Sequence, residues 1–447
     1  MTGGLPPLSQ PPGGAADRRV EAATEAEPAE PPNRRTAVPP IGRSAIGALF
    51  PALSHSNFRR FYGGQLVSLL GTWMGSTAQA WLVLLLTDSP FYVGLVGALG
   101  SLPVLLVSLY AGTVADRISK LRLIMITQGS AMVLALALAA LTFAEVVQVG
   151  HIIVIATLLG VVSAFDIPAR QSFFVEMVGK PDLLNAIALN SAAFNVTRVL
   201  GPAVAGVLIG KIGVAMCFLL NGLSFLAVLA ALSSIDSPPI RRSAGPPSAL
   251  AHMREGLRYV RSDSRILTLT LVLAVLSVFG FPYLVLLPVM VRDVLGRGAV
   301  EFGWMSSAVG VGALTGALVL AAFATRMPKG RVVKWASITF GVIVSAFAMS
   351  RSLPLSLALV ALTGFTMITN TATINTLLQS ITPDELRGRV MSVYTLSFIG
   401  MGPIGALGAG WAAEQLGAPA ALVLGGGVCL VASLVAHSRV PAVGRMP

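Results

Sequence analysis

One short charged segment between two apolar runs holds the residue types best suited to reversible ion pairing. In residues 112–122 the acid Asp116 is followed by three cations, Arg117, Lys120 and Arg122. A carboxylate at a helix end can pair with cations in the next turn, or with the positive N-terminus of a neighbouring helix. Such pairing can hold one conformation closed and release it in another. The alternative is a basic loop that only sets orientation in a membrane.

Asp166 and Arg170 form a second charged pair near the end of another apolar run. Their four-residue spacing places them on one helix face, where a local pair contributes about 0.2–0.5 kcal/mol. Carboxylates are almost absent from the deep parts of the apolar runs. Asp166 is therefore the best candidate for an acid that carries a proton, if the chain couples its work to protons.

Arg198 lies deep inside an apolar run. Counting about 12 residues at 1.5 Å each puts it about 18 Å from the start of the run, near mid-bilayer. An arginine there costs at least about 2.5 kcal/mol, so it should face protein or a watered cavity. Two interpretations stay open. Arg198 attracts an anionic or carbonyl-rich cargo, or it binds polar groups of a neighbouring helix beside Gly201-Pro202.

Two helical stripes of hydroxyl and amide side chains could line a cavity or form hydrogen bonds between helices. The stripes are Gln65, Ser68, Thr72, Ser76 and Gln79 in one run, and Thr363, Thr366, Asn370, Thr373 and Thr376 in another. We interpret them as cavity-lining. The candidate cavity residues are Gln65, Ser68, Thr72, Gln79, Arg198, Asn370 and Thr373.

The elements that must position these residues are membrane helices. The chain is 55% hydrophobic and 11% charged, whereas soluble domains are about a quarter charged. A membrane span needs about 20 apolar residues. Twelve runs qualify, so we predict an all-α polytopic protein with twelve transmembrane helices in two six-helix bundles. The runs are roughly 61–86, 91–115, 122–144, 151–169, 186–210, 214–235, 266–290, 303–325, 332–350, 354–377, 390–414 and 418–436.

A repeated pattern divides these spans into two halves. Pro181-Asp182 is followed about twenty residues later by Gly201-Pro202, and Pro383-Asp384 is followed in the same way by Gly402-Pro403. The repeat predicts two bundles with a seam between them, and transporters hold their cargo at such seams. Proline can kink a helix and glycine permits close contact, so both Gly-Pro pairs are interpreted as helix-packing sites.

The composition outside the spans completes the domain plan. Residues 1–54 are rich in proline among Ala, Glu and Arg, which predicts a disordered tail. The other predicted parts are a bundle at 55–235, a linker with a short basic helix at 236–265, a bundle at 266–437 and a tail at 438–447.

The net charge of +12 reflects orientation and does not indicate nucleic-acid binding. The cations gather in alternate loops, which predicts a multi-pass inner (plasma) membrane protein with both termini in the cytoplasm. No continuous basic face on a folded domain is visible, so nucleic acid is not an expected partner. Cys217 and Cys429 are interpreted as small buried side chains, and no metal-ligand spacing is present. We therefore expect no metal and no cofactor.

Residues 112–122 resemble the loop signature Gly-x-x-x-Asp-Arg-x-x-[Arg/Lys] of the major facilitator superfamily. A degraded echo in the second half spans residues 325–331, with threonine in place of the acid. Residues 166–174 and 198–206 are similar to the branch called transmembrane secretion effectors, which includes enterobactin-exporter-like and macrolide-efflux-like proteins. The resemblance covers roughly residues 55–437.

This resemblance implies alternating-access export of a small amphipathic organic molecule, such as a drug or siderophore. It implies an inner gate formed by Asp116, Arg117 and Asp166, which Arg170, Lys120 and Arg122 join. Gly201, Pro202, Gly402 and Pro403 resemble the antiporter signature in part. In the family, spans 1, 4, 7 and 10 line the cavity, and a monomer suffices.

Three alternatives to a proton-coupled exporter remain. The first alternative is an uncoupled facilitator, the second is a non-transporting membrane sensor or scaffold, and the third is a membrane enzyme. An enzyme would need paired acids or His-Asp groups at one membrane face. No such group of residues is visible, so we predict no enzymatic activity.

Overall fold

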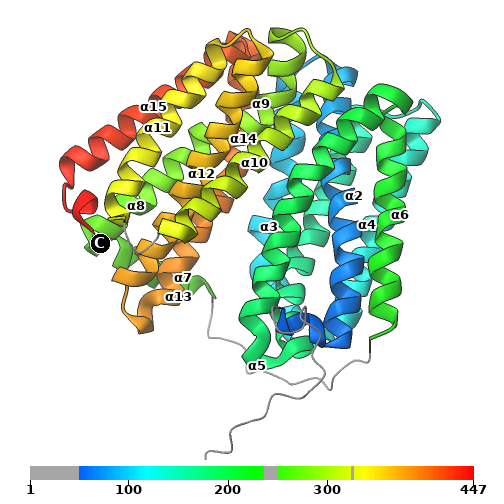
Figure 1. Ribbon diagram of the computed structural model, residues 1–447, viewed down its shortest axis with the longest axis horizontal. Coiled ribbons are helices and arrows are strands. Elements are labelled where there is room, and N and C mark those ends of the chain that lie inside the picture. The colour runs from blue at the N-terminus through cyan, green and yellow to red at the C-terminus, as the bar shows by residue number, and fades with distance from the viewer. Residues whose placement is uncertain (1–49, 236–248, 324–326, 447) are drawn as a thin grey trace, which may run out of the picture. The chain divides into compact units, whose positions relative to one another are not determined.

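The computed structural model describes residues 50–235, 249–323 and 327–446, and every regular element in these ranges is helical (Figure 1). A short 3-10 helix, η1 (Pro51–Ser54), precedes the first long helix. The first group of helices comprises α2 (Ser56–Thr87), α3 (Pro90–Arg117), α4 (Lys120–Phe143), α5 (Val149–Ile212) and α6 (Val214–Ser233).

The second group follows the basic helix α7 (Ala249–Ser262). Three of its elements, η2, η3 and η4, are single π-helical turns inside longer helical runs. The group comprises α8 (Ser264–Val275), η2 (Leu276–Gly280), α9 (Tyr283–Val289), η3 (Met290–Val294), α10 (Ala299–Phe323), α11 (Lys329–Met349), α12 (Leu353–Ile381), α13 (Asp384–Thr395), η4 (Leu396–Gly400), α14 (Gly402–Leu416), α15 (Ala418–Arg439) and η5 (Val443–Arg445).

Within the described ranges, eleven helical segments are long and apolar enough to cross a membrane. The sequence predicts twelve, and α5 accounts for the difference. It has 64 residues, about 96 Å at 1.5 Å each, or about three times the hydrocarbon thickness. Gly179 breaks it with φ 72° and ψ 174°, between the predicted spans 151–169 and 186–210. The protein is thus an all-α polytopic membrane protein.

Equivalent turns recur in the two groups. Gly213 joins α5 to α6 with φ 92°, and Gly417 joins α14 to α15 with φ 84°. Each glycine ends one helix and begins the next, a backbone conformation that other residues rarely adopt. The two Pro-Asp pairs are also equivalent, because Pro181 follows the break in α5 and Pro383 is the N-cap residue of α13.

The two groups meet along two helix pairs. Within the first group α2 packs on α5 and α6, and within the second α12 packs on α10 and α11. Between the groups, α3 packs against α14 and α5 packs against α10. We call these four helices the seam.

Glycines set the closeness of both seam contacts. A Cβ atom on Gly410 would lie 3.0 Å from the Cα of Gly94, and one on Gly303 would lie 2.9 Å from the Cα of Gly206. Both distances are shorter than ordinary van der Waals contact. The backbones can therefore approach only because these positions lack side chains.

Two segments outside the predicted bundles pack against the second group. In α7, Glu255 forms an ion pair with Arg389 of α13. Near the chain end Val443 and Met446 are buried, and the amide of Gly330 donates to the Met446 carbonyl at 3.2 Å. Of the predicted disordered tail, residues 1–49 lie outside the described ranges, as do residues 236–248 of the predicted linker.

We predict that Gly410→Ala destabilises the protein by about 1–3 kcal/mol, because the added methyl overpacks the α3–α14 contact. Its Cβ would lie 2.9 Å from the Pro90 carbonyl oxygen. Gly408→Ala is the matched control on the same helix, because nothing lies within 4 Å of its Cβ position. Thermal unfolding of the purified protein in detergent measures both variants. Equal unfolding midpoints would contradict the seam assignment.

Candidate functional site

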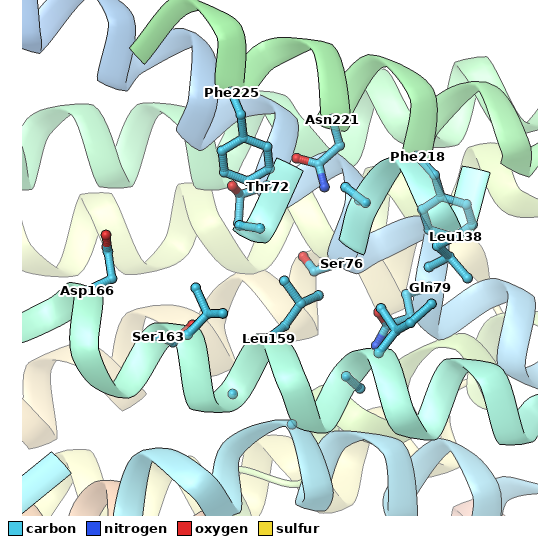
Figure 2. Close-up of a pocket in the computed structure, with 18 of the residues that line it drawn as sticks. Thr72, Ser76, Gln79, Leu138, Leu159, Ser163, Asp166, Phe218, Asn221 and Phe225 are labelled. Carbon is cyan, nitrogen blue, oxygen red and sulfur yellow. The ribbon is translucent and has the colours of Figure 1, made fainter. Parts of the chain in front are cut away.

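A cavity of about 270 Å³ lies inside the first group of helices (Figure 2). It is lined by α2, α3, α4, α5 and α6, so it belongs to one bundle and not to the seam. Asn221 and Phe225 of α6 point into it across from Leu159 and Ser163 of α5. Its volume is near the lower end of the roughly 300–1,000 Å³ typical of small-molecule pockets.

Asp166 forms the charged end of this cavity. Its side chain is buried and forms an ion pair with Arg170, one turn further along α5. It also accepts hydrogen bonds from Thr127 Oγ1 at 2.8 Å and Gln128 Nε2 at 2.9 Å, both on α4. The pair is therefore more than a local helix-end contact, because it ties α4 to α5.

Some hydrogen-bonding capacity in the cavity lining is unused. The Nε of Arg170, the Oε1 of Gln128 and the Oδ1 of Asn221 are buried without a partner among the described residues, and all three residues line the cavity. A buried polar atom without a partner costs free energy, which a ligand or a water can recover. One donor and two acceptors are thus available to a bound molecule.

The polar stripe on α2 divides into two parts. Thr72, Ser76 and Gln79 line the cavity. Gln65 and Ser68 are buried, each 2% exposed, and do not line it. The hydroxyl groups of Thr72 and Ser76 donate to carbonyl groups of their own helix, which leaves their oxygen lone pairs free to accept hydrogen bonds.

The stripe on α12 lies outside this cavity. The amide of Asn370 donates to Ser337 Oγ of α11 at 2.5 Å, and Thr373 donates to the Thr369 carbonyl at 2.6 Å. Asn370 and Thr373 are each 1% exposed. The Asn370 contact is a hydrogen bond between helices, which was the alternative to a cavity lining. The Thr373 contact stays within α12, and Thr373 also lines a small hollow of about 40 Å³ between α10, α11 and α12.

Arg198 lies apart from the cavity, beside the seam. Its guanidinium carbon is 5.9 Å from the centroid of the Trp73 ring, which itself packs edge-on against Phe194. Tyr283 of α9, in the other group, is within electrostatic range of Arg198. The Tyr283 hydroxyl is fully buried and has no hydrogen-bond partner in the described part of the chain.

The structure describes only some of the side chains of the predicted inner gate. The ends of α3 and α4 expose Arg117 and Arg122, and Lys120 pairs with Glu176 of α5 at 2.6 Å. The side chain of Asp116 and residues 325–326 of the loop echo at 325–331 lie outside what the structure describes. Among the described side chains, hydrogen bonds and ion pairs do not connect the loop cations to Asp166.

The two Gly-Pro pairs have different surroundings. A Cβ on Gly201 would lie 2.5 Å from the Trp73 Cβ, and the Pro202 carbonyl faces Gly303 across the seam. Gly402 has open space around it, and Pro403 is buried in the first turn of α14, just after the π-helical η4. The first pair is therefore part of the seam.

Sequence reasoning missed the hydrogen bond from Ser307 Oγ of α10 to the Val199 carbonyl of α5, at 2.7 Å, and two further polar contacts that cross between the groups. In the first, Arg292 of η3 donates to Asp88 at 2.5 Å and to the Leu84 carbonyl at 3.0 Å. In the second, Glu414 of α14 accepts from Ser89 Oγ at 2.7 Å and from the amide of Phe91 at 3.3 Å. We call these the Arg292 latch and the Glu414 latch.

The sequence did carry signals for some of the missed residues. Asp88 and Glu414 are isolated charges at the ends of apolar runs, Arg292 is followed directly by Asp293, and all lie at the same end of the spans. Gln128 and Asn221 are amides inside runs that are otherwise almost wholly apolar. Amides at such depth are costly unless they bond to something, which is the signal that could have found them.

We predict that breaking the buried pair destabilises the protein more than removing the pair altogether. Asp166→Leu or Arg170→Met alone leaves an uncompensated buried charge and should cost about 3–5 kcal/mol. The double variant should lie within about 2 kcal/mol of the parent protein. Lys120→Met, in a more accessible pair, should cost at most about 1 kcal/mol. The free energy of unfolding in mixed detergent micelles measures all four, and additive single effects would contradict the pairing.

Residues 47–445 match the family described as transmembrane secretion effector. The chain is 27% identical to the staphyloferrin A transporter of Staphylococcus aureus over 78% of this chain and 87% of that protein. It is 30% identical to the multidrug efflux pump Tap of Mycolicibacterium fortuitum, over 76% and 85% of the two chains.

The fold is similar to a bacterial homologue of the human lysosomal transporter Spinster, with a TM-score of 0.69 and 14% identity. That likeness covers 91% of this chain and 100% of the other. The family consists of membrane transporters, not enzymes. The chain therefore belongs to the transmembrane secretion effector family of the major facilitator superfamily.

Proposed function

We propose that this chain exports a small amphipathic organic molecule, such as a drug or siderophore, across the inner (plasma) membrane by alternating access. The relatives named a staphyloferrin A transporter and a multidrug efflux pump support this class of cargo. The observation that carries the proposal is the position of the contacts between the two groups. The two latches and both glycine contacts lie toward the same ends of the helices.

The helix ends that carry the latches and the glycine contacts lie opposite to the charged loops. Gly94 lies near the start of α3, whereas Arg117 lies at its end, close to Lys120 and Arg122. If these cations face the cytoplasm, as the positive-inside bias indicates, the latches face outward and both termini lie inside. The structure then corresponds to a transporter closed toward the outside.

Alternating access requires that this closure can be reversed. Contacts between small residues bury little side-chain surface, and each latch is an ion pair or a carboxylate bound at a helix N-terminus. Such contacts are individually weak, so the groups can separate without unfolding. In this mechanism the moving bodies are the predicted bundles 55–235 and 266–437, and one monomer suffices.

The Asp166 cavity is the best candidate for the cargo site. Leu138, Leu159, Phe218 and Phe225 give it apolar walls, which alternate with hydroxyl and amide groups (Figure 2). A lining of this kind suits a molecule with both apolar surface and hydrogen-bonding groups. Arg198 adds a cation beside the seam, where an anionic part of the cargo would be stabilised.

We predict that tying the outer ends of the two groups together stops export. Ser89→Cys with Glu414→Cys, joined through two disulfides by a short bis-methanethiosulfonate reagent, should abolish efflux, and reduction of these disulfides should restore it. The background carries Cys217→Ser and Cys429→Ser, because both native thiols are free. Efflux is measured with a compound chosen from a labelled panel in an efflux-deficient bacterial host.

The control link stays within one group. His55→Cys with Asp182→Cys replaces a 2.7 Å contact between residues of the first group, and the link should leave efflux intact. Full efflux with the Ser89–Glu414 link in place would refute alternating access. A panel in which the chain lowers the accumulation of no compound would favour a non-transporting sensor or scaffold.

The source of energy is a separate question with two candidates. In a proton antiporter Asp166 carries the proton, whereas an uncoupled facilitator follows the gradient of its cargo. We predict that a protonophore lowers efflux by the parent chain, and that Asp166→Asn efflux is small and insensitive to the protonophore. Efflux by the parent chain that the protonophore leaves unchanged would remove Asp166 as a proton carrier and support the facilitator.

A further inference from the structure

A second hollow lies in the second group of helices, whereas the Asp166 cavity lies in the first group. It is a crevice of about 440 Å³ between α10, α11 and α12, beside the N-terminus of α11. Its walls are mainly apolar and include Leu320, Trp335 and Phe365. Trp335 is 61% exposed, so the crevice opens to the outside of the bundle, where lipid surrounds the protein.

The charges at the mouth of this crevice have one sign. Lys329, Arg331 and Lys334 lie in the first two turns of α11, and Arg331 lines the crevice directly. Within α10, α11 and α12 the single acidic residue is Glu301, which lies at the far end of α10. An anion at the mouth therefore meets cations, and no carboxylate from the described residues of the adjacent ends of these three helices.

The crevice extends from its charged mouth toward the membrane interior. Arg331, Trp335 and Thr339 all line the crevice and follow one face of α11. The eight residues from Arg331 to Thr339 correspond to about 12 Å along the helix. Lys334 Nζ lies 5.7 Å from the Trp335 ring centroid, a pairing typical of headgroup depth.

We propose that this crevice binds an anionic phospholipid, with its phosphate at Arg331 and an acyl chain between α10, α11 and α12. Basic pockets between transmembrane helices on the cytoplasmic side are suited to anionic headgroups. The cargo is a poorer candidate occupant, because the crevice shares no lining residue with the Asp166 cavity. The inference does not depend on what the chain exports.

The test measures lipid retained by the full-length purified protein. Protein equilibrated in micelles with equal amounts of phosphatidylglycerol and phosphatidylcholine is analysed by native mass spectrometry. The parent protein should retain phosphatidylglycerol preferentially. Arg331→Ala should lower that preference about fivefold, the effect of one cation near an anionic headgroup. Arg297→Ala, an exposed arginine at the opposite end of the spans, should leave it unchanged.

A steric pair tests the crevice itself. Thr339→Trp fills the hollow from α11 and should lower the retention of phosphatidylglycerol. Val342→Trp is the matched control, because Val342 is exposed on the same helix and does not line the crevice. Thermal unfolding shows that each variant is folded. Equal retention of the two lipids by the parent protein, or equal losses in Arg331→Ala and Arg297→Ala, would overturn the proposal.

Discussion

The close approach of two helix pairs, α3 on α14 and α5 on α10, is the constraint on which the structure depends. In lipid, helices gain no hydrophobic energy by meeting, so association depends on close packing and polar contacts. Gly94 with Gly410 and Gly206 with Gly303 provide the packing. The Arg292 and Glu414 latches provide the polar contacts at the same ends. A contact surface made in this way can separate at small cost, which a transporter needs and a rigid scaffold does not.

The two seam contacts also relate the halves of the chain. Gly94 on α3 and Gly303 on α10 lie about as far apart in sequence as the two Gly-Pro pairs do. Gly206 and Gly410 keep a similar separation, and so do the turn glycines Gly213 and Gly417. By these separations α10 is the counterpart of α3, and α14 is the counterpart of α5. Thus α3 packs on the counterpart of α5, and α5 packs on the counterpart of α3. This is the relation expected when a duplicated bundle packs against its copy.

Much of the fold could be predicted because the bilayer fixes the length of each apolar run. The helical run through Gly179 was not predicted, since a local break can leave helical hydrogen bonding on both sides. The cavity was harder. A polar stripe shows which face of a helix is polar, but it does not show what that face contacts. Two similar stripes therefore have different surroundings: Thr72 lines the cavity, whereas Asn370 donates to Ser337. The latches cross between distant segments, and no local pattern encodes them.

The charged contacts form two sets, one inside the first bundle and one between the two bundles. Asp166 and Arg170 lie in one bundle, so their pairing cannot itself hold the two bundles together. The latches do cross, but they lie at the opposite ends of the helices. If Asp166 takes up a proton, Arg170 loses its anionic partner, and its Nε has no hydrogen-bond partner among the described residues. An anionic or carbonyl-bearing cargo would then replace the carboxylate, so proton and cargo would act on the same guanidinium. In a facilitator the pair would stay intact, and the cargo would bind through the neutral groups of Gln128 and Asn221.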